Sequence, residues 1–570
     1  MFKRIAILAV LGLVIGGVVA VVAVGFVEAV LALNDALLVS PGSRTAQADG
    51  RTLTILTIAV PTIGGLLVGL LGLLLRERRF HGPPDAIRAA HTADSAMPVR
   101  GGIVSAIAAC LSLGAGASVG QYGPLVHLGA SIGAWLRQLA RVEPSIGNIG
   151  IACGAAAAIS AAFHAPIAGL IFAREVILRH YSLRAFAPIA VASTIAYVIA
   201  HVVLQRQPLF QIANHVVASP WEYGVFIGIG IGGALLALVY VRAIRYAGSL
   251  AQQLDVPAPV KTALAGLALG ITALQVPEVL GIGQDVLRHA MRGELYGTLD
   301  LAVILVTKLL MTAICLGFGF AGGVFSPALL IGALFGAFIG GGTELLFTEQ
   351  HSYIAVYAVC GIVAVTGPVI GAPLTMVLIV FELTQNFDLA AAAMISVAFA
   401  NLVGFRVIGR SLFDEQLRAS GFDLSRGRDK VTAERQRIRS LLHEDYTSAP
   451  ATATLIELRS QLVRDRRSEV HIVDAAGDYL GTLSLHRLME LADSGTSPDE
   501  PAIAHAHVAD ATLTPDTSVW DAMTQIQGFV GESIPVLDHG KLVGALSEGE
   551  IVGAYLDIVE GTRREEHAAG

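Results

Sequence analysis

Two five-residue motifs, 203 residues apart, carry the residue types in this sequence that are best suited to binding an ion. They are Gly120–Pro124 (GQYGP) and Gly323–Pro327 (GVFSP), and each opens an apolar segment. Glycine lets a backbone approach a ligand closely, and proline is favoured at a helix start, where an N–H would have no partner. Two helix N-termini aimed at one point form an anion site, because free N–H groups and the helix dipole both favour negative charge.

The sequence around these motifs indicates a polytopic membrane protein. The chain is 54% hydrophobic and 15% charged, whereas about 25% of the residues in a soluble domain are charged. Several apolar runs are shorter than the roughly 20 residues that a perpendicular membrane helix needs, and many contain glycine. Short, broken helices in corresponding halves are typical of transporters with inverted repeats and a site near the middle of the membrane. We expect apolar segments at residues 5–33, 52–75, 100–118, 124–140, 148–173, 183–205, 222–246, 260–276, 298–319, 326–347, 352–366, 370–384 and 388–407.

A second pair of features indicates an internal repeat. Glu175 follows Pro166 by nine residues and Glu382 follows Pro373 by nine residues, so these two features are 207 residues apart. This offset nearly equals that of the two Gly-x-x-x-Pro motifs, which favours a duplicated architecture. A carboxylate inside a membrane is a functional candidate by default. The symmetric placement of Glu175 and Glu382 nevertheless favours a structural role, a hydrogen bond to a helix end.

The N-terminal sequence predicts a retained membrane helix. The apolar run from Ile5 to Leu33 is longer than the roughly 7–15 apolar residues of a signal peptide. Lys3 and Arg4 precede this run, which places the N-terminus in the cytoplasm by the positive-inside rule, and we expect the C-terminus there too. Basic residues are mostly Arg and Ala is abundant, which favours a bacterial inner membrane as the location of the protein.

Composition argues against several classes of function. The net charge is −7 and no basic patch is present, so we expect no nucleic-acid partner. All four cysteines lie in apolar segments without metal-ligand spacing or a disulfide pattern, so we expect buried thiols and no metal. The sequence has no His-Glu-x-x-His motif and no paired intramembrane Asp, and we expect neither catalytic residues nor an enzyme.

The C-terminal part has a different organisation. Residues 408–440 are polar and rich in Arg and Asp, and we expect them to form a linker. After it, helices at 454–463 and 486–492 enclose two strands at 469–473 and 479–483. The same order of elements recurs at 519–528, 534–537, 541–546 and 548–555.

This repeated unit resembles a tandem pair of CBS domains, which are small α/β modules. On this resemblance the first domain spans 441–495, the second spans 506–560, and 561–570 form a tail. Ser547 and Glu550 resemble the segment that contacts a nucleotide ribose in this module, although Glu stands where the module has Asp. Two interpretations stay open here: an adenine-nucleotide site, or a purely structural pair that forms a dimer.

The membrane part resembles the CLC family of chloride channels and proton-coupled chloride antiporters over nearly all of residues 1–415. The family signatures occur in order, with Phe80–Pro84 at the first, Gly120–Pro124 at the second and an intact third at Gly323–Pro327. The segment AAFHAP, residues 161–166, is also similar to the family. The resemblance implies an all-α polytopic domain with an inverted repeat at 1–407, a homodimer in the lipid membrane, and one anion pathway in each subunit.

The chain departs from the family pattern at chemically active positions. Tyr122 stands where the family has a gating glutamate that carries protons. A phenol titrates near pH 10, about three units above neutral pH, so it does not cycle between charge states there. His81 stands where a serine lines the anion site, and Phe413 stands where a tyrosine donates a hydroxyl. The internal proton-relay glutamate of some members aligns near Gln207, which is not a carboxylate.

Our leading hypothesis is therefore a passive pathway, a channel or uncoupled transporter, for chloride or a similar small monovalent anion, with no cofactor. Tyr122 is the expected gate, and it either lines the pathway or blocks it. Backbone N–H groups would bind the anion, assisted by the side chains of Tyr122 and His81. The residues expected to bind the anion or line its pathway are His81, Gly82, Gln121, Tyr122, Gly123, Val324, Phe325 and Phe413.

Two alternatives belong beside this hypothesis. The first is a proton-coupled anion antiporter in which His81 replaces the missing glutamate, since imidazole titrates near neutral pH. The second is a nucleotide-sensing regulatory membrane protein, in which the CBS pair binds an adenine nucleotide through Ser547 and Glu550.

Overall fold

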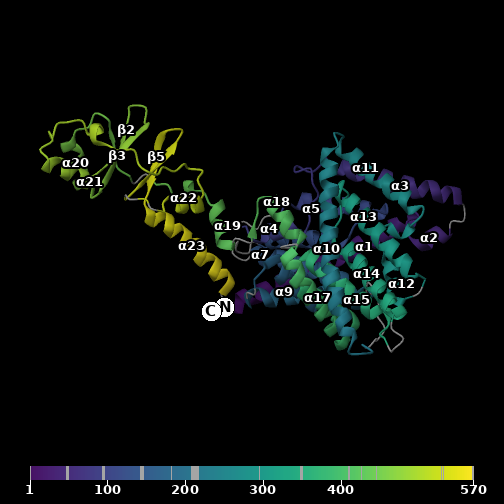
Figure 1. The fold of residues 1–570 in the computed structure, drawn as a ribbon. Coiled ribbons are helices and arrows are strands. Elements are labelled where there is room, and N and C mark those ends of the chain that lie inside the picture. Colours follow the sequence, from purple (N-terminus) through teal and green to yellow (C-terminus); the bar gives the residue numbers. More distant parts are fainter. Residues whose placement is uncertain are drawn as a thin grey trace. The chain divides into compact units, whose positions relative to one another are not determined.

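The computed structural model divides into two compact units, Met1–Phe422 and Asp423–Ala568, and each is described by itself. Helices make up the first unit, and the second contains helices and short strands (Figure 1). The structure describes residues 2–567 except for 47–49, 93–96, 141–146, 181–182, 207–216, 294, 347–350, 408–410, 425–426, 444–445, 528 and 530–531.

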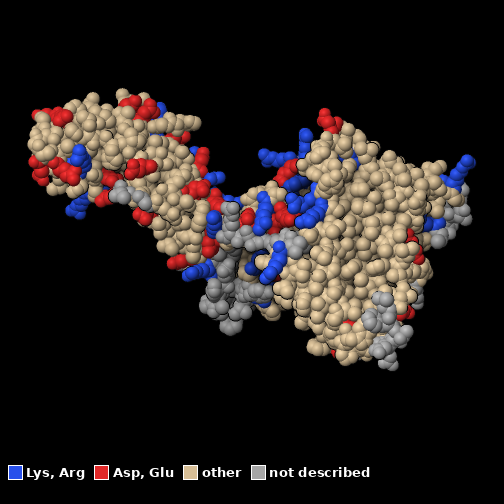
Figure 2. All heavy atoms as spheres, viewed as in Figure 1, with Lys and Arg blue, Asp and Glu red and all other residues tan. Residues whose placement is uncertain are grey.

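The first unit is a bundle of apolar helices. Seven of its described helices are long and apolar enough to cross a membrane. Figure 2 shows few charged side chains over the broad face of this bundle, as expected for a surface that contacts lipid. The long helices are α1 (Phe2–Ala36), α3 (Gly50–Gly72), α9 (Leu183–Tyr197) with its continuation η3 (Val198–Val203), α10 (Glu222–Gln253), α13 (Thr298–Gly317), α14 (Phe325–Leu346) and α17 (Phe387–Val407).

Shorter helices complete the bundle, as the short apolar runs of the sequence predict. Every predicted apolar segment contains a helix, and the run predicted at 148–173 is divided into two helices by His164 and Ala165. The shorter elements are α2 (Pro41–Ala46), α4 (Pro83–Ala90), α5 (Val99–Gly114), α6 (Tyr122–Leu139), α7 (Gly147–Phe163), α8 (Pro166–Phe172), η2 (Ala173–Leu178), α11 (Ala258–Ala273), η4 (Pro277–Val279), α12 (Gln284–Arg292), α15 (Ile354–Ile370), α16 (Pro373–Thr384) and α18 (Leu412–Ala419).

Equivalent glycines let equivalent helices touch in the two halves of the repeat. A Cβ atom on Gly154 would lie 1.9 Å from the carbonyl oxygen of Gly129, where α7 meets α6. A Cβ atom on Gly361 would lie 2.2 Å from the carbonyl oxygen of Gly332, where α15 meets α14. Small residues at such crossings allow close backbone packing in membranes. The repeat therefore extends from the motifs to the helix pairs that carry them.

The carboxylates of Glu175 and Glu382 cap helices, and this confirms their predicted structural role. Glu382 accepts hydrogen bonds from the N–H groups of Ile167 (2.8 Å) and Ala168 (2.7 Å), at the start of α8. Glu175 accepts hydrogen bonds from the N–H groups of Leu374 and Thr375 and from the Thr375 hydroxyl, at the start of α16. Each half of the repeat thus caps a helix of the other half.

The second unit contains two helix–strand–strand–helix halves, as predicted. Each half has its own core of buried apolar side chains. A three-stranded sheet in the order β1-β2-β3 forms in the first half, and an antiparallel pair, β4 and β5, forms in the second. The elements are α19 (Arg428–Arg435), η6 (Ile438–Leu441), β1 (Ser448–Pro450), α20 (Leu455–Asp465), β2 (Glu469–Val473), β3 (Tyr479–Ser484), α21 (Leu485–Asp493), η7 (Ala502–His505), α22 (Val519–Gln525), β4 (Ile534–Asp538), β5 (Lys541–Leu546) and α23 (Glu548–His567).

Two predicted boundaries differ from the observed elements. The segment predicted as a linker contains α18 and α19, and α18 buries its apolar residues Leu412, Phe413 and Leu417. The predicted tail begins inside α23, which continues to His567. Both differences have the same cause, because amphipathic helices with many charged residues resemble loops in composition.

Candidate functional site

The two Gly-x-x-x-Pro motifs lie against each other in the first unit. The N–H of Gly120 donates to the carbonyl of Gly323, and the N–H of Gly323 donates to the carbonyl of Gly120, both at 2.7 Å. A Cβ atom on Gly123 would lie 2.9 Å from the Cα atom of Gly323, so this backbone approach requires glycine. The structure therefore brings the two predicted helix N-termini, those of α6 and α14, to one point.

The hydrogen bonds at this point are not symmetric. The N–H of Gln121 donates to the hydroxyl of Ser326 at 3.2 Å. In the first motif the residue that corresponds to Ser326 is Gly123. Glycine has no hydroxyl, so the N–H of Val324 has no equivalent acceptor. The N–H groups of Val324 and Phe325 donate to none of the residues that the structure describes. In the first motif the N–H groups of Tyr122 and Gly123 likewise donate to none of the described residues, so Ser326 occupies one of the donors predicted near Gln121–Gly123 and leaves the other two open.

Tyr122 belongs to a cluster of three buried aromatic rings. Its ring centroid lies 4.2 Å from that of Phe163 and 5.4 Å from that of Phe325, and the centroids of Phe163 and Phe325 are 5.3 Å apart. The Tyr122 side chain is 1% exposed, and its hydroxyl has no hydrogen-bond partner among the described residues. Phe163 was not predicted as a site residue, although it lies in the AAFHAP segment that carried part of the resemblance.

A cavity of about 630 Å³ leads to this region. Residues of the Phe80–Pro84 segment, of the second motif and of α18 line it, and the predicted site residues among them are His81, Gly82, Val324 and Phe413. The other predicted site residues, Gln121, Tyr122, Gly123 and Phe325, do not line this cavity.

The cavity wall carries more positive than negative charge. Its charged lining residues are four cations and one carboxylate: Arg78, Arg79, Arg88, Lys261 and Asp85. Asp85 is neutralised by Arg79, whose guanidinium lies 2.7 Å from the carboxylate. A cleft lined by one sign of charge concentrates ions of the opposite sign, so this cavity attracts anions.

His81 stands on this wall with a second histidine behind it. Its backbone N–H donates to the hydroxyl of Ser105 at 3.0 Å. Its ring stacks on that of His127, with centroids 5.5 Å apart. The N–H of the adjacent Gly82 donates to Asp85 at 2.9 Å and is therefore not free for an anion. Gln207, predicted at the relay position, lies outside the described residues.

The segment Gly116–Gly120 (GASVG) fits the Gly-x-Ser-x-Gly pattern of some hydrolases, which sequence analysis overlooked. That pattern needs an exposed serine at the turn between a strand and a helix. Ser118 is instead fully buried, and its hydroxyl shares a hydrogen bond with that of Thr312 at 2.9 Å. The residue therefore links the two halves of the repeat and is not placed as a nucleophile.

Ser547 and Glu550 form a helix cap in the second unit. The Glu550 carboxylate accepts hydrogen bonds from the N–H and the hydroxyl of Ser547, both at 2.8 Å, and lies 2.5 Å from the His443 ring. Burial alone would raise the pKa of Glu550, but these hydrogen bonds lower it. The carboxylate is thus held as an anion at the start of α23.

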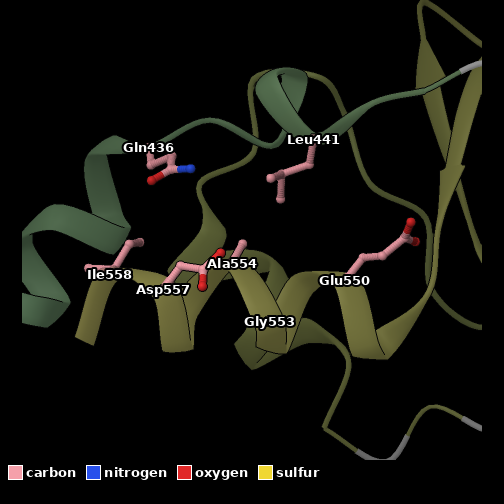
Figure 3. Close-up of a pocket in the computed structure, with 7 residues that line it drawn as sticks. All are labelled: Gln436, Leu441, Glu550, Gly553, Ala554, Asp557 and Ile558. Carbon is pink, nitrogen blue, oxygen red and sulfur yellow. The ribbon is translucent and has the colours of Figure 1, made fainter. Parts of the chain in front are cut away.

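A pocket of about 460 Å³ lies beside this cap (Figure 3). Glu550 and Asp557 line it, and none of its described lining residues is a cation. Two carboxylates repel a phosphate group. This arrangement disfavours a nucleotide and favours the structural interpretation of Ser547 and Glu550. The pocket is lined by Gln436, Leu441, Glu550, Gly553, Ala554, Asp557 and Ile558.

Comparison with known proteins adds to these observations. A family model described as voltage gated chloride channel matches residues 63–404, and a CBS domain model matches residues 507–557. A ClcB-like protein of Ralstonia nicotianae is 30% identical over 347 residues, which cover 60% of this chain and 80% of that protein.

Two solved structures share the fold. A slow cyanobacterial Cl⁻/H⁺ antiporter has a TM-score of 0.65 and 23% identity over 72% of this chain and 97% of its own. A eukaryotic CLC transporter has a TM-score of 0.62 and 20% identity over 96% of this chain and 99% of its own.

Proposed function

Because this chain belongs to the voltage-gated chloride channel family, we propose that it is a passive pathway for chloride or a similar small monovalent anion. The observation that carries the proposal is the position of Tyr122. A neutral phenol stands at the meeting point of two helix N-termini, packed between Phe163 and Phe325. At this meeting point the helix N-termini attract an anion, and Tyr122 offers a phenol in place of a carboxylate that could exchange protons.

The route of the anion follows from the charges and donors along the cavity. Arg78, Arg88 and Lys261 raise the local anion concentration in the cavity that they line. Beside Val324, which lines the cavity, the free N–H groups of Val324 and Phe325, reinforced by the dipole of α14, bind the anion. These are partial charges, so binding is weak enough for the anion to leave again. Tyr122 and its two aromatic neighbours then form the narrow part of the route.

Flux measurements on the purified full-length protein in liposomes test this proposal. An outward chloride gradient should drive chloride efflux that collapses to equilibrium, while an internal pH indicator records no uphill proton movement. A chloride gradient that drove protons uphill at a fixed ratio would overturn the passive mechanism. Protein-free liposomes and heat-denatured protein give the baseline for both readouts.

A proton-coupled mechanism is the second candidate, and the stack of His81 on His127 favours it. Of these two imidazoles, His81 lines the anion cavity, whereas His127 is buried behind it. On this mechanism His81→Ala would abolish proton movement and leave a chloride leak. On the passive mechanism the same variant changes the chloride rate only, because no protons move in either protein.

The assembly and placement of the protein are further parts of the proposal. We infer a homodimer with one pathway in each subunit and residues 1–407 as the membrane domain, placed in a bacterial inner membrane with both termini in the cytoplasm. The multi-pass membrane character itself rests on the family and on the apolar helices.

The paired CBS domains at 441–495 and 506–560 are proposed as structural. Calorimetry with ATP, ADP and AMP tests this, since tight binding of any of them would favour a nucleotide-sensing role instead.

A further inference from the structure

A buried tyrosine outside the cavity is bonded to the second motif. The hydroxyl of Tyr240, on α10, donates to the carbonyl oxygen of Val324 at 3.3 Å. Tyr240 is 0% exposed and does not line the cavity that Val324 lines. The same carbonyl also accepts the first hydrogen bond of α14, from the N–H of Ala328 at 3.1 Å. The Val324 carbonyl is therefore held from within the protein by two donors.

Because of the geometry of the peptide bond, this contact also fixes the direction of the Phe325 N–H group. A peptide bond is planar, and in its trans form the C=O and the N–H point in opposite directions. The structure has no cis peptide among its described residues. Because Tyr240 holds the Val324 carbonyl on one side, the N–H of Phe325 must point to the other side, away from Tyr240. That N–H is one of the donors without a partner among the described residues.

The first motif lacks such an arrangement. The carbonyl of Gln121, which corresponds to that of Val324, accepts only the N–H of Leu125 (3.2 Å) among the described residues. The N–H of Gln121 is taken by Ser326. The two motifs are therefore not equivalent, since Tyr240 holds the Val324–Phe325 peptide of the second motif while Ser326 occupies the Gln121 N–H of the first.

We propose that Tyr240 is a positioning residue for the transported anion, which acts by holding the Val324–Phe325 peptide so that the Phe325 N–H faces the anion. This inference rests on the proposed anion pathway and adds a residue that touches neither the cavity nor the ion. The orientation is set before the anion arrives, so the anion does not have to reorganise the peptide.

Chloride titration of the purified full-length protein by calorimetry tests the proposal. Tyr240→Phe keeps the buried ring and removes only the hydroxyl, and we expect the chloride dissociation constant to rise about 3- to 10-fold, the effect of losing one oriented hydrogen bond. Tyr357→Phe is the matched control, because Tyr357 is equally buried and its hydroxyl bonds to Glu222 instead. We expect the control to bind chloride like the wild type.

The Ser326→Ala variant distinguishes a loss of peptide orientation from a general loss of packing at the site. This variant frees the Gln121 N–H, so its chloride affinity should stay equal or increase. A loss of affinity equal to that of Tyr240→Phe would contradict the proposal. Equal affinities of Tyr240→Phe and the wild type would also overturn it, while leaving the anion pathway intact. Absence of chloride binding by the wild type would overturn both the pathway and the role of Tyr240.

A measurement on the wild type covers the case in which Tyr240→Phe does not fold. In protein labelled with ¹⁵N-phenylalanine, the Phe325 amide resonance should shift as chloride is added, with the midpoint found by calorimetry. Phe325→Tyr identifies this resonance, because it removes the label from that position alone. An amide signal that chloride does not move would refute the orientation inferred for the Phe325 N–H.

Discussion

Glu175 and Glu382 exchange caps across the repeat, each binding the N-terminus of a helix that belongs to the other half. Each capped helix begins with a proline, Pro166 or Pro373. Proline has no N–H at the first position, so the next two N–H groups are the first that need acceptors. The two oxygens of one carboxylate satisfy both, and the negative charge is favourable at a helix N-terminus.

The first prediction concerns the stability that these caps provide. Glu175→Gln and Glu382→Gln each keep one acceptor oxygen and remove the charge, so each should destabilise the folded protein by about 1–2 kcal/mol. The thermal midpoint of the purified protein in detergent should fall for both variants. Glu344→Gln is the control, because Glu344 is exposed on α14. Midpoints of both cap variants equal to that of the control would show that the caps contribute nothing.

The second prediction concerns Tyr122 and separates its ring from its hydroxyl. Tyr122→Phe keeps the contacts with Phe163 and Phe325, so chloride flux should stay within about threefold of the wild type if the hydroxyl contributes one neutral hydrogen bond or less. Tyr122→Ala removes a fully buried ring, which should widen the route, increase flux, and destabilise the protein by about 3–5 kcal/mol. Liposome flux and thermal unfolding measure the two effects. Flux abolished by both substitutions would show that the hydroxyl itself carries the anion.

The third prediction concerns the missing phenol at Phe413. Phe413 is 4% exposed and lines the cavity together with Val324 and His81. Phe413→Tyr adds a donor there, and a hydrogen bond to a charged group is worth about 1.5–3 kcal/mol. Chloride should therefore bind more than tenfold more tightly by calorimetry and leave more slowly, which lowers the flux. Phe318→Tyr, in the same cavity wall, is the matched control and should bind chloride like the wild type.

The repeat, the helices and the strands could be predicted because their signals are local in sequence. Glycine and proline mark helix starts, and two features with nearly equal offsets indicate the duplication. The residues that decide the asymmetry of the site could not be predicted. The contact between Tyr240 and Val324 joins positions 84 apart, and that between Gln121 and Ser326 joins positions 205 apart. Neither contact leaves a periodic pattern in the sequence.

The segment predicted to bind a nucleotide was difficult to interpret for a different reason, because its spacing in the sequence fits two roles. Ser547 and Glu550 were considered for a ribose because their spacing resembles that of a binding motif. The same spacing, Ser followed three residues later by Glu, is that of a capping box at a helix start. Both residues cap α23 in the structure. A spacing that fits two physical roles is resolved only by the charges around it, and here these are the carboxylates of Glu550 and Asp557.

A buried histidine in the second unit joins its two halves. His471, on β2, is 1% exposed, and its two ring nitrogens lie 2.8 Å from the hydroxyl of Thr482 and 3.2 Å from that of Ser533. Ser533 in turn donates to Glu469 at 3.0 Å, so it accepts from His471. The hydroxyl of Thr482 also lies 2.7 Å from that of Tyr479, so it can accept from Tyr479 and donate to the other ring nitrogen. The network therefore fits a neutral imidazole with one N–H.

The last prediction follows from this network. Burial lowers the pKa of His471 to about 4, whereas the ordinary value, expected in the unfolded chain, is about 6.5. Between these two values the unfolded chain binds a proton that the folded unit does not, so the free energy of unfolding should fall by about 3 kcal/mol as the pH falls from about 6.5 to 4. Hydrogen exchange of β2 and β3 in the full-length protein, corrected for the intrinsic pH dependence, measures this loss.

His471→Gln should be less stable at pH 8 but should lack this component of the pH dependence. His539→Gln, at a side chain that is 98% exposed, should retain it. An unchanged pH dependence in His471→Gln would assign the acid sensitivity to another group.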